Sequence, residues 1–129
     1  MATTKPTNHS KPIHYIDATF NSDKKLVERK DATEDLTCCT FVFHHQDHTL
    51  GNALRSIISQ YEGVELCGYT NPHPLEAKIH LRIQTDPRRD DLTPKIVLDR
   101  ALEDLKGQCV IVKQKFLDAF DEFEKGMEY

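Results

Sequence analysis

The residues best suited to metal chemistry lie in one short stretch, in which His44, His45 and His48 surround Asp47. Imidazole and carboxylate groups are common ligands of zinc and iron. However, the stretch joins the end of an expected strand to the start of an expected helix, so His44 and His48 do not share one helical face. The chain also has no His-Glu-x-x-His motif. We therefore interpret these side chains as strand-end and helix-capping groups and predict no metal site.

No Cys-x-x-Cys spacing joins the four cysteines, Cys38, Cys39, Cys67 and Cys109, which argues against a disulfide framework. A catalytic thiol needs a lowered pKa and an orienting base, and no such pairing is visible. Cys39, Cys67 and Cys109 fall on apolar faces, where free cysteine usually packs as a small core residue. With no glycine-rich phosphate loop and no Gly-x-Ser-x-Gly motif, the sequence predicts neither catalytic residues nor a bound cofactor.

Composition limits the classes of protein that fit. The chain has 129 residues, which suits one domain, and its net charge of -4 is the wrong sign for a protein that binds nucleic acid on its own. Its longest apolar runs fall far short of the roughly 20 residues that span a bilayer. The start of the chain has no apolar leader, and together with the cysteine pattern this indicates a reducing cytosol or nucleus.

The first 35 residues differ in composition from the rest of the chain. They hold six basic and six acidic side chains and few apolar ones, so little burial offsets the entropy of ordering them. We predict a flexible N-terminal tail over residues 1–35, within which Ile13–Phe20 is a candidate for a short ordered patch. The folded domain is expected to cover residues 36–129.

Hydrophobic periodicity predicts an α+β domain in the order β-α-β-β-α, with a small antiparallel sheet, one short helix packed on it and a long C-terminal helix. Asp47 or Thr49 is the expected N-cap of the short helix, and Gly63 is expected to close it. The expected elements are a strand over Leu36–His44, a helix whose apolar stripe runs from Leu50 to Tyr61, strands over Val64–Thr70 and Ala77–Gln84, and a helix that begins at Pro94 after the N-cap Thr93.

The last helix is too long for the domain that precedes it. From Pro94 to Lys125 it would measure roughly 48 Å at ~1.5 Å per residue, whereas a strand of eight residues spans only ~26 Å. A bend at Gly107 would separate a packed first half from a projecting second half. The apolar residues follow a heptad repeat: Leu98, Leu102, Leu105, Cys109, Val112, Phe116, Ala119 and Phe123. The second half would expose this stripe to water, so the sequence predicts a partner helix that covers it.

Two further features have competing interpretations. Gly51-Asn52 lies inside the first helix, where a glycine usually marks the close approach of another backbone. The β-α-β-β-α order also invites comparison with RNA-binding sheets, which stack bases on aromatic side chains. The third strand offers Lys78, His80 and Arg82 without an aromatic pair, so direct nucleic-acid binding is the less favoured alternative. We interpret the basic pair Arg88-Arg89 as part of a solvated loop.

The stretch Asp47–Arg55, with sequence Asp-His-Thr-Leu-Gly-Asn-Ala-Leu-Arg, resembles the signature of the alpha-like dimerisation subunits of multisubunit RNA polymerases. Cys67-Gly68-Tyr69, His73-Pro74 and Arg82–Thr85 follow in the family's order, and the resemblance covers residues 38–125. The short connector at residues 71–76 resembles that of the smaller alpha-like subunit. Val64–Tyr69, Arg82–Thr85 and Cys109 with Lys115-Phe116 are similar to the form shared by polymerases I and III. The polymerase II form is the alternative.

The resemblance implies an alpha-like dimerisation fold and a chain that does no chemistry itself. Such a subunit forms an obligate heterodimer with the larger alpha-like subunit, and the pair is the assembly platform for the two largest, catalytic subunits. It would support synthesis of ribosomal RNA precursors, 5S RNA and tRNA in the nucleus, including the nucleolus. It would meet DNA only through the complex and would contact no membrane.

The family pairs through its first and last helices, and this places candidate partner-binding residues in both. The expected hydrophobic contacts are Leu50, Leu54, Ile57, Ile58, Leu105, Val112, Phe116 and Phe123. The signature residues His48, Gly51, Asn52 and Arg55 are assigned, as a hypothesis, to close packing or to polar contacts with a large subunit.

Overall fold

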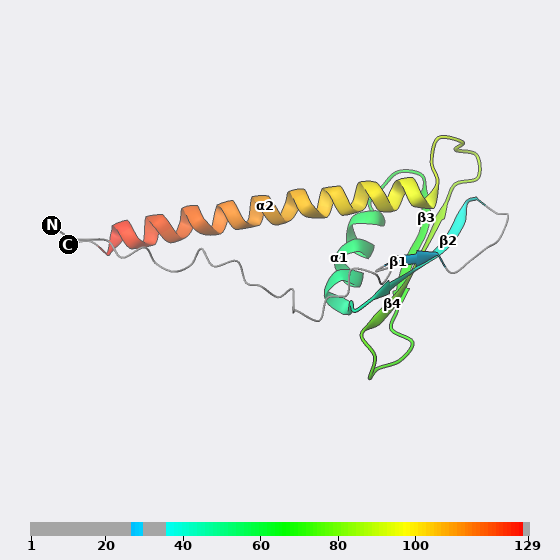
Figure 1. The fold of residues 1–129 in the computed structure, drawn as a ribbon. Coiled ribbons are helices and arrows are strands. Elements are labelled where there is room, and N and C mark those ends of the chain that lie inside the picture. The colour runs from blue at the N-terminus through cyan, green and yellow to red at the C-terminus, as the bar shows by residue number, and fades with distance from the viewer. Residues whose placement is uncertain (1–26, 30–35, 128–129) are drawn as a thin grey trace.

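The computed structural model describes residues 27–29 and 36–127. Its elements are β1 (Val27–Arg29), β2 (Cys38–His44), α1 (His48–Ile58), β3 (Val64–Thr70), β4 (Lys78–Thr85) and α2 (Pro94–Gly126). The strands form one antiparallel sheet in the order β1-β2-β4-β3, and both helices lie on the same side of it (Figure 1). The expected β-α-β-β-α order is thus confirmed from β2 onward, with one additional strand before it.

The additional strand β1 lies inside the range that the sequence assigned to a flexible tail. Val27–Arg29 pairs with Phe41–Phe43 of β2, so these three residues belong to the sheet. Pairing at a sheet edge uses backbone N–H and C=O groups, which leave no hydrophobic pattern in so short a segment. The expected patch at Ile13–Phe20 lies outside the described residues.

The core forms between the sheet and the two helices. Across the central strand pair, Cys39 lies opposite Ile83, Phe41 opposite Leu81 and Phe43 opposite Ile79, and all six side chains are buried. This is the face that the period-two alternation predicted, because successive strand residues point to opposite sides. The helices complete the core with Leu54, Ile57 and Ile58 from α1 and Val97, Leu98 and Ala101 from α2.

The short helix α1 begins as expected and ends earlier than expected. The Asp47 carboxylate accepts a hydrogen bond from the backbone N–H of Thr49 at 2.9 Å, so Asp47 is the N-cap. Ser59 is the C-cap, and its hydroxyl donates to the Arg55 carbonyl at 2.6 Å. Gly63 therefore does not close the helix. Its φ of 87° belongs to the turn into β3, a conformation that glycine adopts without steric cost.

Gly51 is required by a side chain rather than by another backbone, which corrects the expectation for this position. A Cβ atom added at Gly51 would lie 2.6 Å from Cδ2 and 2.8 Å from Cε2 of Tyr69. The Tyr69 ring on β3 thus lies directly against the α1 backbone. The signature glycine sets the distance between α1 and the sheet.

The long helix α2 begins at Pro94, after Thr93, whose hydroxyl accepts from the Ile96 N–H at 3.4 Å. Its 33 residues correspond to about 50 Å, and it continues without interruption through Gly107 (Figure 1). Its buried residues end at Ala101, and every residue from 106 to 126 is exposed. Within the described part of the chain, no helix is long and apolar enough to cross a membrane.

Gly51→Ala is expected to lower the free energy of unfolding by about 1–3 kcal/mol, because the new methyl group overlaps the Tyr69 ring. Gly107→Ala is the matched control. Its added Cβ meets nothing within 4 Å, so it should raise helix stability by up to about 1 kcal/mol. Urea unfolding followed by circular dichroism measures both. Combining Gly51→Ala with Tyr69→Leu should recover part of the lost stability, because the smaller side chain makes room for the new methyl group. Equal changes in stability for Gly51→Ala and Gly107→Ala would contradict this packing.

Candidate dimerisation surface

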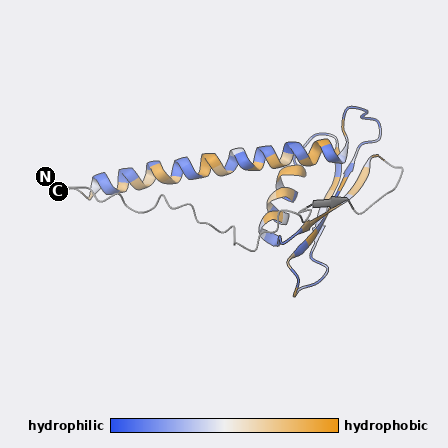
Figure 2. Ribbon diagram, in the orientation of Figure 1, coloured by the Kyte–Doolittle hydropathy of each residue, from blue (hydrophilic) through white to orange (hydrophobic). Residues whose placement is uncertain are grey.

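The projecting half of α2 carries a continuous apolar stripe, which we call the distal stripe. It consists of Cys109, Val112, Phe116, Ala119, Phe120 and Phe123. Val112, Phe116 and Phe123 expose 66%, 66% and 65% of their surface, and Figure 2 shows hydrophobic segments alternating with hydrophilic ones along the projecting part of α2. The rings of Phe116 and Phe120 stack with centroids 6.2 Å apart and planes inclined by 18°. The stripe is therefore an exposed ridge with an aromatic centre.

Exposure of this ridge is costly in water. Full burial of a Val or Phe side chain contributes about 1.5–3 kcal/mol, so covering several of them supplies a large share of a stable interface. The heptad spacing suits a second helix, whose side chains would insert between those of the distal stripe. Nothing in the described residues covers it. The exposed apolar stripe that the heptad predicted is thus present on α2.

The cysteines differ in burial according to whether they lie in the core or on the distal stripe. Cys39 is buried in the core, as predicted, and Cys67 is half-buried beside it. Burial raises the pKa of the Cys67 thiol to about 11, with a smaller opposing effect from Arg55. Cys109 is exposed, so its prediction as a core residue of this chain is wrong. The heptad places Cys109 on the apolar side of α2, but the sheet ends before it.

Tyr61 connects the end of α1 to α2 at the point where α2 leaves the domain. Its hydroxyl donates a hydrogen bond to the Asp104 carboxylate, and the Arg100 guanidinium lies 4.7 Å from the ring centroid. Burial, and then this hydrogen bond, raise the pKa of Tyr61 to about 12. A groove of about 520 Å³ follows along α2, lined by Ile57, Gln60, Gln108 and Ile111 among others. These contacts hold the direction of the projecting half.

The expected hydrophobic contacts divide into three groups by burial. Leu54 and Ile58 have no exposed surface and Ile57 is 8% exposed, so these three belong to the chain's own core. A partner side chain cannot reach Leu54 or Ile58 unless the core opens, which differs from the expectation of direct contact. Leu50 and Leu105 are half-buried at the margin of the core. Only Val112, Phe116 and Phe123 lie together on the exposed helix.

The polar signature residues lie on a different side of the molecule. His48, Asn52 and Arg55 are exposed on α1 and recur at i, i+4 and i+7, so they form one row along the helix. The Nδ1 atom of His48 lies 3.0 Å from the Tyr69 hydroxyl, and the two rings meet edge to face. Sequence reasoning placed Tyr69 in the family pattern but gave it no role. The structure makes it the common contact of His48 and Gly51.

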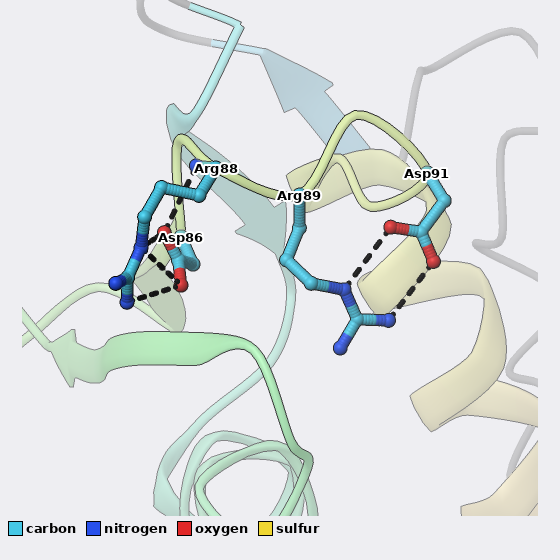
Figure 3. A network of polar contacts seen from close by, with 4 residues as sticks. All are labelled: Asp86, Arg88, Arg89 and Asp91. Atoms are coloured by element: carbon cyan, nitrogen blue, oxygen red, sulfur yellow. Dashed lines mark hydrogen bonds and ion pairs between the residues drawn. The ribbon is translucent and has the colours of Figure 1, made fainter.

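The basic pair Arg88-Arg89 is neutralised within its own loop. Figure 3 shows Arg88 paired with Asp86 and Arg89 paired with Asp91, each at 2.9 Å. These hydrogen bonds lower the pKa values of both carboxyl groups below their usual range. The loop therefore offers no free pair of cations for phosphate. No group of three or more potential metal ligands occurs among the described residues.

Comparisons with known proteins point to one family. Residues 38–115 match the family described as the RNA polymerase Rpb3/Rpb11 dimerisation domain. The chain is 56% identical over 70 residues to the DNA-directed RNA polymerases I and III subunit RPAC2 of Drosophila melanogaster, a match that covers 54% of this chain and 63% of the fly protein. It is 42% identical to the subunit of that name from Schizosaccharomyces pombe over 98 residues, 76% of each protein. The chain thus spans less than two thirds of the fly relative.

A solved structure shows the same fold. DNA-directed RNA polymerase subunit L from Thermoplasma acidophilum superposes with a TM-score of 0.60 at 16% identity. The match covers 80% of this chain and 98% of the archaeal one. At this identity the likeness concerns the fold alone.

Tyr61→Phe is expected to lower the free energy of unfolding by about 0.5–1.5 kcal/mol at neutral pH, because it removes the hydrogen bond that joins the segment after α1 to α2. The pKa of Tyr61 is raised from 10.0 to about 12, so its stabilisation is complete below pH 10 and is lost as the pH rises toward 12. Asp104→Asn should move the Tyr61 pKa part of the way back, as measured by carbon-13 NMR of labelled tyrosine. Asp99→Asn, which leaves Tyr61 untouched, is the control.

Proposed function

Because the chain belongs to the RNA polymerase Rpb3/Rpb11 dimerisation family, we propose that it is the smaller alpha-like subunit of RNA polymerases I and III. It forms a heterodimer with the larger alpha-like subunit. The observation that carries the proposal is the distal stripe, an exposed heptad of apolar side chains on a helix that extends about 30 Å beyond Leu105.

In this proposal the chain is a non-catalytic assembly scaffold. The heterodimer serves as the platform for the two largest subunits, which carry out synthesis of ribosomal RNA precursors, 5S RNA and tRNA. The chain acts in the nucleus, including the nucleolus, and meets DNA only through the complex. The pairing of Arg88 and Arg89 with carboxylates and the net charge of -4 support this indirect relation to nucleic acid.

The burial of α1 within the chain limits which apolar residues can contact a partner. We assign direct apolar contact with the larger alpha-like subunit to Leu105, Val112, Phe116 and Phe123, with Leu50 at the margin. Leu54, Ile57 and Ile58 act indirectly, because they hold α1 against the sheet. His48, Asn52 and Arg55 lie outside the distal stripe and remain available to a different subunit.

Phe116→Asp should weaken pairing with the co-expressed larger alpha-like subunit by at least about 100-fold, because it places a carboxylate at the centre of the apolar ridge. Co-purification and light scattering of the pair measure the effect. Val110→Asp is the matched control, since Val110 is 62% exposed on the same helix but lies off the heptad. Equal pairing of both variants, or a stable monodisperse monomer of the unaltered chain, would argue against the proposal.

Purification of the tagged full chain from its own cells should recover the two largest subunits of both polymerase I and polymerase III. The prediction follows from the relatives named for polymerases I and III and is read by mass spectrometry. Recovery of the polymerase II subunits alone would assign the chain to the alternative form.

A further inference from the structure

The strand β3 forms one edge of the described sheet. Val64–Thr70 pairs with β4 on one side, and no described strand pairs with its other side. The opposite edge is formed by β1, which has only three residues. Natural edge strands are usually short or carry lysine or proline, because their unpaired N–H and C=O groups accept further strands. β3 has no proline, and its single charged side chain, Glu65, lies at a register irregularity between Val64 and Leu66, so the regular open edge runs from Leu66 to Thr70.

The helix α1 runs beside this edge. His48 and Gly51 contact Tyr69 of β3, and Arg55 lies close enough to Cys67 for its charge to act on that thiol. α1 also packs against α2, and just beyond the end of α1 the Tyr61 hydroxyl donates a hydrogen bond to Asp104 of α2. The row formed by His48, Asn52 and Arg55 therefore lies on the β3 side of α1, above the open edge. A segment placed along β3 would pass beneath it.

The two faces of the edge differ in chemistry. On the face covered by α1, Arg55 is exposed, and no carboxylate in the described part of the chain lies within ion-pair distance of it. On the opposite face, Leu66 exposes 47% of its surface, and a Cβ atom at Gly68 would meet nothing within 4 Å. One face thus presents the Arg55 guanidinium with no carboxylate partner among the described residues. The other face presents the apolar Leu66 side chain beside open space at Gly68.

We propose that β3 and the row His48, Asn52 and Arg55 form a strand-addition site. An extended segment of another polymerase subunit, distinct from the dimer partner, pairs with β3 as the next strand of the sheet. Because strand side chains alternate between faces, the segment places a carboxylate toward Arg55 and aliphatic side chains toward Leu66 and Gly68. Main-chain hydrogen bonds supply affinity, and the carboxylate fixes the register. The inference rests on the proposed function for the identity of the assembly and uses a surface separate from the distal stripe.

Amide hydrogen exchange tests the added strand directly. The heterodimer is compared with the complete polymerase purified through the tagged chain, and peptides covering β3 and β4 are followed by mass spectrometry. We expect the outward-facing amides of β3 to exchange at least tenfold more slowly in the polymerase. The amides of the central strand β4 are already paired on both sides and should change little. Unchanged exchange over β3 in the polymerase would overturn the proposal.

The charge of Arg55 is tested by substitution in the heterodimer. Arg55→Glu should reduce recovery of the large subunits at least tenfold while pairing with the larger alpha-like subunit is retained, and Arg55→Lys should restore part of the recovery. Lys95→Glu, an exposed charge reversal at the start of α2, is the control and should have no effect. Unchanged recovery with Arg55→Glu would exclude the carboxylate contact.

The other possible occupants give distinct results. Protection of β3 already complete in the heterodimer would assign the edge to the dimer partner. Concentration-dependent protection in the isolated chain would assign it to a second copy. Either result would overturn the inference and leave the proposed heterodimer intact, whereas loss of the heterodimer itself is tested separately at Phe116.

Discussion

The organisation of the molecule depends on the difference in length between α2 and the domain to which it is attached. The sheet and α1 bury α2 only as far as Ala101, with Leu105 half-buried, whereas the helix continues to Gly126. An isolated helix gains little from backbone propensity alone, and the apolar face normally supplies its stability. Here that face continues beyond any surface that the described chain can offer. This excess of exposed apolar surface is the basis for the proposed contact of the distal stripe with another polypeptide.

The packing of α1 divides the functional residues between two surfaces. Its apolar side is used within the chain, because Leu54 and Ile58 are buried against the sheet. Its polar side lies on the flank that contacts Tyr69 of β3, and α2 projects away from the sheet (Figure 1). In the proposed assembly, two separate surfaces would allow the chain to hold its dimer partner and a second subunit at the same time. This arrangement suits an assembly platform.

The direction of α2 where it leaves the domain also sets the position of its far end. Its direction is set where it leaves the domain, by the Tyr61–Asp104 hydrogen bond and the Arg100 contact with the Tyr61 ring. A rotation of 10° at that point would displace the tip of a ~30 Å rod by about 5 Å, roughly one helical turn. A partner helix that follows the heptad would lose its register at such a displacement. The contacts at the base of α2 therefore matter for residues far from them.

Residue spacing along the chain was sufficient to predict most of the elements and the exposed stripe on the last helix. Period-two alternation located β2 and β4, and the heptad from Leu98 to Phe123 together with the length of the helix predicted the projecting stripe. These features are local, so periodicity and residue spacing are sufficient to predict them. The family pattern then identified the signature residues in α1, although it did not distinguish their surroundings.

Which apolar residues stay exposed depends on the tertiary packing. Leu54 and Phe116 have the same kind of sequence pattern, because each is an apolar residue on the stripe of a helix. Leu54 nevertheless packs in the core, whereas Phe116 lies beyond the sheet and is exposed. Burial depends on which surfaces meet, and those contacts join residues far apart in the chain. The role of Gly51 depends in the same way on its contact with the Tyr69 ring. The strand β1 is defined by its backbone pairing with β2. Local patterns contain no record of either contact, because neither changes the spacing of residues along the chain.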